Sequence, residues 1–324
     1  MAKAKKPLKA ALQSQQSRLK LKQKATQAAQ TAELKKNGAS KAQSKAHSVK
    51  GKGKEVAHPR APTIPFRATD KILLIGEGNF SFARALVVDP PAELEHLPAR
   101  NITATAYDTE PACYEKYPEA EEIVLKLKAA GIEVLFGIDA TRLSRVAAFK
   151  GRTWDRIVWN FPHAGKGITD QDRNILSNQL LVLGFLRSAA GLLATGSVPE
   201  YNVKKRKRPT DDDDDEPEDV DGYVHPDDED ISKSVACRGT ILITLRNVVP
   251  YTQWDVPRLA KHPPPPASGS APSNPPYTLL RSFAFSRNAW KGYEHRMTKG
   301  ERAYGTGKTG EGGEDRTWEF FLQD

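Results

Sequence analysis

Short apolar runs alternate with amphipathic stretches along most of the chain. Seven runs have the length and the β-branched or aromatic content of strands, at Ile72–Ile75, Asn101–Tyr107, Ile132–Phe136, Trp154–Trp159, Gly239–Leu245, Tyr277–Phe285 and Thr317–Leu322. Stretches expected to be helical lie between them, at Ser81–Val88, Glu110–Tyr117, Glu119–Ala130, Ala140–Phe149, Asp170–Leu193 and Gln253–His262. This alternation predicts an α/β fold with a doubly wound, mainly parallel sheet. The late strand pair is expected to form its antiparallel edge.

Three segments fall outside this pattern. Residues 1–66 are rich in Ala, Lys, Gln and Ser without a wide apolar face, so a disordered basic tail is expected before a domain that spans residues 67–324. Residues 197–236 hold runs of like charge, which repel one another, and are expected to be a disordered insertion. Residues 262–276 are expected to form a proline-rich loop.

Charge is unevenly distributed along the chain. The net charge is +9, yet residues 1–60 carry 16 Lys and Arg against 2 Glu, which leaves the rest of the chain negative. A basic tail on a near-neutral body is typical of a protein that binds nucleic acid, although a solubilising tail would have the same composition. A basic run in the insertion matches a nuclear-import signal, or else balances the acidic run beside it; it comprises Lys204, Lys205, Arg206, Lys207 and Arg208.

Composition also excludes several classes of protein. Only Cys113 and Cys237 are present, which argues against a disulfide scaffold or a Cys-rich zinc site and fits a reducing intracellular compartment. The first residues contain no apolar signal segment, and the most apolar stretch, Ile175–Leu193, is interrupted by polar residues. No membrane association is expected, and nothing in the sequence requires a metal.

A glycine turn follows the first expected strand, at Gly76 and Gly78. At the carboxyl end of such a strand, a turn without side chains lets a nucleotide approach the backbone and the start of the next helix. Glycine also permits a positive φ if the turn needs one. Because G-x-G occurs often by chance, a plain connection between a strand and a helix is an equal alternative at this point.

Polar residues also end the next three expected strands. Asp108 follows the second strand, Asp139 the third and Asn160 the fourth. The first acid can accept hydrogen bonds from ribose hydroxyls, and the second can receive an adenine amine. Each Asp could instead cap a helix, but two of them beside a glycine turn favour a site for a nucleoside-containing cofactor. Asp155, at the start of the fourth strand, is expected at the opposite edge and not in the site.

The fourth strand runs into Asn160, Phe161, Pro162 and His163. An Asn amide can bind a base edge, an aromatic ring can stack on an unpaired base, and proline stiffens the turn. His163 could take up a proton near neutral pH, although an ordinary surface-loop histidine would look the same in sequence. The motif therefore predicts a catalytic site for base chemistry beside the cofactor.

Five segments together resemble the eukaryotic ribosomal-RNA uridine-N3-methyltransferase family of the 25S type: KILLIGEGNFSFARAL, ATAYDTE, GIDATRL, WDRIVWNFPHAGKG and SFAFSRNAWKGYEHRMT. The resemblance implies a class I fold that uses S-adenosylmethionine, with strand order 3-2-1-4-5-7-6. It also implies methylation of a uridine in large-subunit ribosomal RNA within the pre-ribosome, in the nucleus and nucleolus. Matched by position, the cofactor loop comprises Gly76, Glu77, Gly78, Asn79 and Ser81, and the catalytic motif comprises Asn160, Phe161, Pro162 and His163.

Two other functions remain open from the residues alone. A nicotinamide-dependent oxidoreductase would also use the glycine turn and Asp108, but its motif needs a third glycine where this chain has Ser81. A nucleolar scaffold could keep the fold without the activity, although the intact turn and motif argue against it. Residues 288–316 mix aromatic and basic side chains in a glycine-rich stretch and are expected to contact RNA. A monomer is expected.

Overall fold

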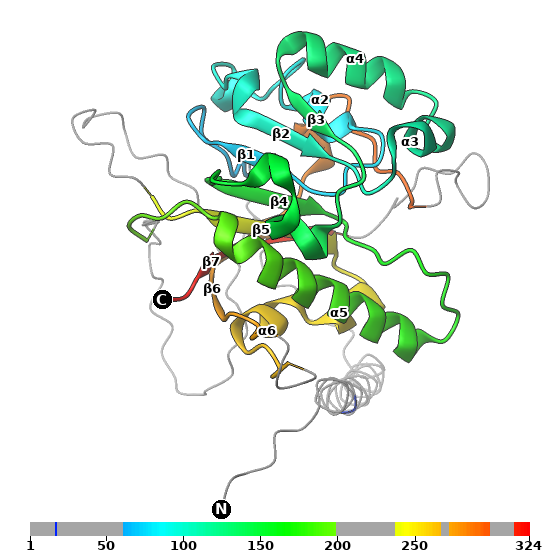
Figure 1. The fold of residues 1–324 in the computed structure, drawn as a ribbon, viewed down its shortest axis with the longest axis vertical. Helices are drawn as coiled ribbons and strands as arrows, with labels where there is room; N and C mark the ends of the chain where they lie inside the picture. The colour runs from blue at the N-terminus through cyan, green and yellow to red at the C-terminus, as the bar shows by residue number, and fades with distance from the viewer. Residues whose placement is uncertain (1–16, 18–60, 199–236, 267–271, 299–313) are drawn as a thin grey trace, which may run out of the picture.

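A seven-stranded sheet forms the centre of the computed structural model, which describes residues 17, 61–198, 237–266, 272–298 and 314–324 (Figure 1). Its strands are β1 Ile72–Leu74, β2 Ile102–Thr105, β3 Glu133–Leu135, β4 Arg156–Asn160, β5 Thr240–Arg246, β6 Tyr277–Ala284 and β7 Asp315–Leu322. The strand order is β3-β2-β1-β4-β5-β7-β6, and β7 runs antiparallel between β5 and β6. The mainly parallel sheet and its antiparallel end confirm the expected fold.

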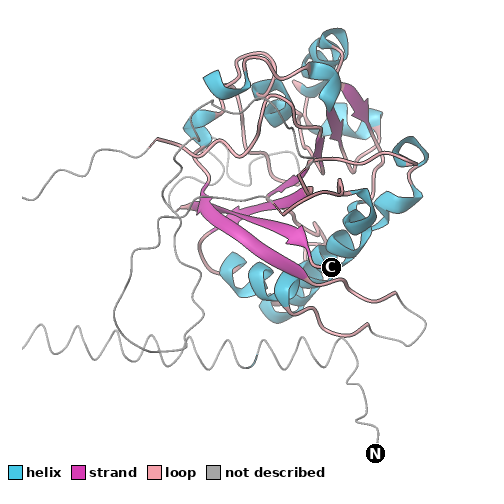
Figure 2. Cartoon of the chain, turned by 90° about the vertical axis from the view of Figure 1, so that its left-hand side faces the viewer, coloured by secondary structure: helices cyan, strands magenta, loops and turns pink. Residues whose placement is uncertain are grey.

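Helices cover both faces of this sheet (Figures 1 and 2). They are α2 Ser81–Ala85, α3 Glu110–Lys116 and α4 Ala120–Ala130 on one face, and α5 Gln171–Ala189 and α6 Val256–Lys261 on the other. Ile72 and Leu73, neighbours on β1, point into the two different cores under these layers. This follows from the alternation of side chains along a strand, and it explains why the parallel strands are apolar throughout.

The helix α5 is the longest in the described part of the chain. By length and composition alone it could cross a membrane, but most of its apolar stretch is buried inside the protein. Val182 and Phe185 are fully buried among the core residues of the sheet. The side chain of Asp170 starts the helix by accepting a hydrogen bond from the backbone N–H of Arg173 at 2.8 Å. The structure therefore uses α5 as a core helix.

Residues 140–149 do not form the α-helix that their pattern predicted. Two short 3-10 helices, Ala140–Arg145 and Ala147–Phe149, replace it, and the first is itself kinked. Leu143 and Phe149 are both buried in the core beside α5. Six residues apart, they would lie about 120° apart around a straight α-helix, and so on different sides of it. Breaking the helix lets both side chains face the core.

The packed domain begins before Arg67, which was the boundary expected from the sequence. Phe66 is buried, and its ring lies 6.4 Å from the ring of Phe82 and 5.8 Å from that of Trp290, measured between centroids. The chain is thus already part of the core at Phe66.

The expected tail and charged insertion lie almost wholly outside the described residues. Residues 1–16, 18–60 and 199–236 are not described, and the last range includes the basic run Lys204 to Arg208. The tail, the insertion and the import signal therefore stay predictions.

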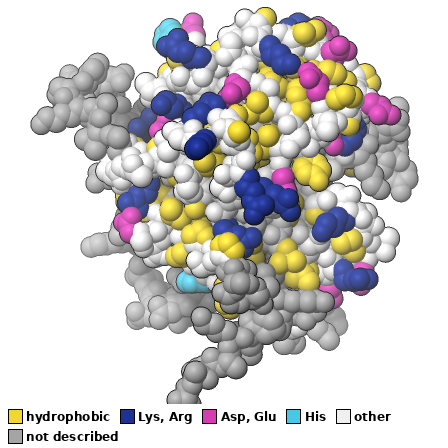
Figure 3. All heavy atoms as spheres, in the orientation of Figure 1, with side chains coloured by type: hydrophobic (Ala, Val, Ile, Leu, Met, Phe, Trp, Pro, Cys, Tyr) yellow, Lys and Arg dark blue, Asp and Glu magenta, His cyan; other side chains and the backbone are white. Residues whose placement is uncertain are grey.

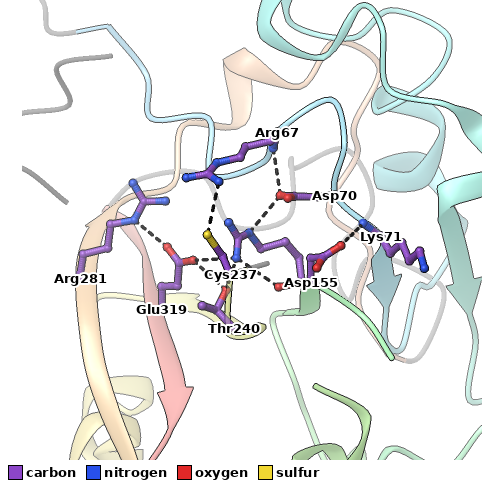
Figure 4. Close-up of polar contacts among 9 residues, drawn as sticks. Arg67, Asp70, Lys71, Asp155, Cys237, Thr240, Arg281 and Glu319 are labelled. Carbon is purple, nitrogen blue, oxygen red and sulfur yellow. Dashed lines mark hydrogen bonds and ion pairs between the residues drawn. The ribbon is translucent and has the colours of Figure 1, made fainter. Parts of the chain in front are cut away.

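A buried network of charged side chains lies at the end of the sheet opposite the carboxyl ends of the parallel strands (Figure 4). Arg156 of β4 contacts Asp70 at 3.1 Å and Glu319 of β7 at 3.9 Å. Arg281 of β6 donates to Glu319 at 2.6 Å. At the same edge Asp155 accepts a hydrogen bond from the backbone just before β1, at 2.8 Å. This placement confirms that Asp155 lies away from the expected site.

Candidate active site

The carboxyl ends of the parallel strands border a cavity of about 630 Å³, the large cavity. Ten of the eleven expected site residues line it: Gly76, Glu77, Gly78, Asn79, Ser81, Asp108, Asp139, Asn160, Phe161 and His163. The remaining one, Pro162, lines an adjoining cavity of about 240 Å³, the small cavity. The parallel topology thus brings residues from four strand ends to one site, as expected.

The glycine turn is shaped by the protein's own side chains. Gly76 has φ +65°, and a Cβ there would lie 2.7 Å from Nε1 of Trp159. A Cβ on Gly78 would lie 3.3 Å from Cζ of Tyr117. The close packing of Trp159 and Tyr117 against the turn therefore favours glycine at both positions, whether or not a ligand is bound.

Glu77 places a carboxyl group in the wall of the large cavity, between the two glycines. Its Oε2 accepts a hydrogen bond from the backbone N–H of Ala83 at 3.3 Å, and no basic side chain pairs with it among the described residues. Burial raises the pKa of Glu77 to about 7, and backbone N–H groups offset only part of this effect. A carboxyl group that titrates near neutral pH, in a cleft and without a counter-ion, suits a cationic ligand.

The two acids after β2 and β3 already have partners within the protein. Asp108 accepts two hydrogen bonds from Nζ of Lys116, at 2.7 and 2.6 Å. Asp139 caps the 3-10 helix that follows it, because its Oδ1 accepts from the N–H and the hydroxyl of Thr141 at 2.8 and 2.7 Å. Capping was the alternative role for each Asp, and the structure shows it for Asp139. Both acids line the cavity, so contact with a ligand stays a prediction for each.

Asn160, the last residue of β4, has a side chain with no hydrogen-bond partner among the described residues. Both its Nδ2 and its Oδ1 are buried, and neither makes a hydrogen bond within the described part of the chain. Buried polar atoms are nearly always paired, so two unpaired ones on a single amide in a cavity wall indicate a ligand that completes them. The amide offers one donor and one acceptor, as a base edge requires.

The ring of His163 is oriented by the loop that carries it. The backbone N–H of Gly165 donates to Nδ1 of His163 at 2.9 Å. The preceding backbone N–H, of Ala164, donates to Oδ1 of Asn178 on α5 at 2.8 Å and so anchors the loop. Burial lowers the pKa of His163, which favours the neutral ring. With Nδ1 occupied as an acceptor, the neutral ring carries its proton on Nε2.

Phe161 occupies a strained position between the two cavities. Its φ is +51°, which non-glycine residues rarely adopt and which is often found at functional sites. The ring of His295 lies 4.3 Å away between centroids, and the guanidinium of Arg287 lies 5.1 Å from the centroid of Phe161. The ring is therefore already partly covered by protein groups. Stacking on a base stays a prediction for the surface that remains.

The segment Arg287–Thr298, the strap, closes over the glycine turn. In Figure 1 it is the orange stretch that lies beside α2. The Ser81 hydroxyl exchanges hydrogen bonds with both the N–H and the carbonyl of Glu294, each at 3.0 Å. The Tyr117 hydroxyl donates to the carbonyl of Met297 at 2.9 Å. The strap thus forms part of the site. The RNA contact that the sequence indicates for residues 288–316 stays a prediction.

Two of the expected cofactor residues serve to hold this strap. Ser81 binds its backbone, and Asn79 donates to Oε1 of Glu119 at 2.9 Å. The same Glu119 oxygen pairs with Arg296 of the strap at 2.6 Å. The contacts with the strap, Ser81 to Glu294 and Glu119 to Arg296, join residues more than 170 positions apart, so local sequence patterns could not reveal them. The recurrence of large aromatics at Trp290 and Tyr293 was the one available sign of packing.

The strap brings His295 to the boundary between the two cavities, and His295 lines both of them. Burial, together with the positive charges of Arg287 and Arg246, lowers the pKa of His295 to about 4. Its ring is therefore neutral at physiological pH. Sequence reasoning placed His295 in an RNA-contacting loop and did not assign it to the cavity.

The strand order with its antiparallel end, and a cavity at the carboxyl ends of the parallel strands, are those of the class I methyltransferase fold. Residues 73–297 match the family model of the BMT5-like rRNA (uridine-N3-)-methyltransferases. The chain is also 31% identical over 263 residues to the 25S rRNA (uridine(2634)-N(3))-methyltransferase of Saccharomyces cerevisiae, a match that covers 74% of this chain and 69% of that protein. The chain therefore belongs to the BMT5-like rRNA uridine-N3-methyltransferase family, which confirms the resemblance found in its motifs.

Similar regions also occur inside longer proteins. Heavy metal-associated isoprenylated plant protein 41 of Arabidopsis thaliana is 26% identical over 238 residues, which are 73% of this chain and 35% of that protein. The ferredoxin-fold anticodon-binding domain-containing protein 1 homolog of Mus musculus is 37% identical over 126 residues, which are 38% of this chain and 18% of that protein.

Proposed function

We propose that this protein transfers a methyl group from S-adenosylmethionine to N3 of a uridine in large-subunit ribosomal RNA. Membership of the family supports the reaction, and the large cavity supports its place on the molecule. The observation that carries the proposal within the structure is the unpaired amide of Asn160 at the carboxyl end of β4. Such an amide fits a base edge that supplies the missing hydrogen bonds.

The part of the large cavity beside β1, β2 and β3 suits the cofactor. Asp108 would bind ribose hydroxyls, Asp139 would receive the adenine amine, and Glu77 would face a cationic part of the molecule. The closely packed glycine turn leaves its backbone open to the cavity. When bound, S-adenosylmethionine supplies a methyl group on a positively charged sulfur. Because this group is already activated, the protein contributes mainly by positioning the reactants.

The part of the site around β4 suits the target base. N3 of uracil lies on the Watson–Crick edge and carries a proton, so the base must be unpaired or flipped out to react. Asn160 would orient this edge, and Pro162 stiffens the loop that follows. Phe161 would offer its uncovered ring surface to the base.

The substrate also bears on the location of the protein. A nuclear and nucleolar location would follow from a pre-ribosomal substrate, with import through the run Lys204 to Arg208.

On the face shown in Figure 3, Lys and Arg side chains lie in several separate groups among neutral and apolar ones. The basic residues 1–60 would therefore add salt-dependent affinity for RNA to that of the folded body. We expect the protein to act as a monomer.

A complementation experiment tests this function. In a yeast strain that lacks the related 25S rRNA methyltransferase, expression of this protein is expected to restore N3-methyluridine in 25S rRNA, measured by mass spectrometry of nucleosides. The Asn160→Ala variant at the same level of expression is expected to leave the rRNA unmodified. Well-expressed wild-type protein that restores no N3-methyluridine would contradict the proposal.

The Gly76→Ala substitution is expected to weaken S-adenosylmethionine binding by about tenfold or more, because relief of a strain of about 1–3 kcal/mol at the left-handed position would move the turn away from the shape that binds the cofactor. The new Cβ would also meet the indole of Trp159. Isothermal titration calorimetry measures the effect. Gly151→Ala is the matched control, because Gly151 has φ +74° but nothing within 4 Å of an added Cβ. Equal affinities for the two variants would remove the turn from the cofactor site.

The affinity for S-adenosylmethionine is expected to rise with pH between about 6 and 8, by up to about tenfold per unit. The folded-state pKa of Glu77 is raised from 4.5 to about 7, so the carboxyl group loses its proton only in this range. Below it the neutral acid attracts no cation, and above it the carboxylate does. Calorimetry at several pH values measures the slope. The Glu77→Gln variant should bind with little dependence on pH, and an unchanged slope in this variant would rule out Glu77 as the cause.

A further inference from the structure

The large and small cavities meet at a shared boundary. The residues that line both are Phe161, His163, Gly165, His295, Arg296 and Thr298. Asn160 lines the large cavity directly beside this boundary, whereas Pro162 and Tyr251 line the small one. A nucleotide that enters through the small cavity would therefore present its base edge to Asn160 and His163.

Two side chains at or beside this boundary, those of His163 and Asn160, can donate hydrogen bonds. The hydrogen bond from the Gly165 N–H to Nδ1 of His163, at 2.9 Å, can run in only one direction, since a backbone N–H cannot accept. The neutral imidazole therefore carries its proton on Nε2, which is a donor. Nδ2 of Asn160 is also a donor, and it is buried without a partner among the residues that the structure describes.

Methylation at N3 of uracil is favoured by hydrogen-bond donors at the two carbonyl oxygens that flank N3. N3 lies between the carbonyl groups at positions 2 and 4, and loss of the N3 proton spreads negative charge over both oxygens. The lone pair that remains on N3 lies in the plane of the ring, so the methyl group must arrive where the proton left. A protein base held against N3 would block this approach. Donors at the two oxygens leave it open and stabilise the developing charge.

We propose that His163 and Asn160 hold the target uracil as hydrogen-bond donors, one at each carbonyl oxygen, while the rest of the nucleotide lies in the small cavity. The inference rests on the proposed function and gives His163 a role other than that of a proton acceptor. In the step itself the N3–H bond breaks and its proton passes to water. N3 then forms its bond to the methyl carbon, and the sulfur keeps the electron pair of the bond that breaks.

Two substitutions of His163 distinguish a role as a hydrogen-bond donor from a role as a proton acceptor. Glutamine places an amide N–H close to the position of Nε2 but does not titrate near neutral pH, whereas alanine offers neither group. In single-turnover methylation with saturating cofactor, His163→Ala is expected to be about 10²-fold slower than wild type. His163→Gln is expected to stay within tenfold of the wild-type rate and to keep its pH profile. Glutamine and alanine variants that are equally slow would overturn the proposal. A wild-type rate that rises with pH through a histidine pKa, with no such rise in His163→Gln, would overturn it as well.

A second readout does not depend on activity. Nitrogen-15 NMR of the histidine side chains distinguishes the two neutral tautomers. The Nε2–H form is expected for His163, and the Nδ1–H form would overturn the proposal. Unchanged cofactor affinity and thermal unfolding of the variants serve as controls for folding. Wild-type protein that methylates no uridine would overturn the proposed function together with this inference, whereas an active wild type with equally slow variants would overturn the inference alone.

Discussion

Replacing Glu319 with alanine is expected to lower the free energy of unfolding by about 3–5 kcal/mol. Glu319 is fully buried on β7, where it accepts from Arg281 at 2.6 Å and from the Thr240 hydroxyl at 2.8 Å. Burial alone would raise its pKa, but Arg281 and Arg156 together hold the pKa below its ordinary value, so the group is charged. Its removal leaves two buried guanidinium groups without this counter-ion. Equilibrium unfolding in urea measures the loss.

A surface ion pair provides the control. Glu133 pairs with Arg152 at 2.7 Å, but their side chains are 38% and 40% exposed. Solvent screens such a pair, and Glu133→Ala is expected to cost less than about 1 kcal/mol. A loss for Glu319→Ala that is no larger than this would show that the buried network does not stabilise the sheet edge.

Replacing Asn160 with alanine is expected to slow methyl transfer by about 10²- to 10³-fold, the usual cost of one lost donor to a developing negative charge. The same substitution is expected to change the free energy of unfolding by less than about 0.5 kcal/mol, because the amide makes no hydrogen bond to any residue that the structure describes. Single-turnover kinetics and urea unfolding measure the two quantities. A large effect on activity with none on stability is the mark of a residue that serves the substrate.

Asn247 offers a matched control for this substitution. It is exposed and lines neither cavity, so Asn247→Ala should leave both the rate and the stability unchanged. Undiminished methyl transfer by Asn160→Ala would remove Asn160 from the mechanism. A stability loss comparable to the loss of rate would mean that the residue acts through the fold.

The architecture was predictable because its signals are local. Apolar runs of strand length, separated by helical stretches, gave the elements of the sheet and its antiparallel end. The strand ends then placed Asp108, Asp139 and Asn160 at one edge, since parallel strands finish on the same side. The structure brings all three to the large cavity, as this argument predicted.

Features that depend on distant partners were not predictable. Glu319 lies between the apolar residues Trp318 and Phe320, and in sequence it resembles a charge on an exposed strand face. Its burial depends on Arg156 and Arg281, which come from two other strands. The same holds for the strap, whose contacts with Ser81 join residues 213 positions apart. Only the folded chain shows that the strap completes the cavity.

The central claim is the transfer of a methyl group to N3 of a uridine in ribosomal RNA. Purified protein can be incubated with S-adenosylmethionine labelled in the methyl group and with 25S rRNA that lacks this modification, and the digested nucleosides can be identified by mass spectrometry. We predict that the label appears in N3-methyluridine with wild-type protein and is strongly reduced with Asn160→Ala. Label in a different nucleoside, or no label despite bound cofactor, would contradict the account.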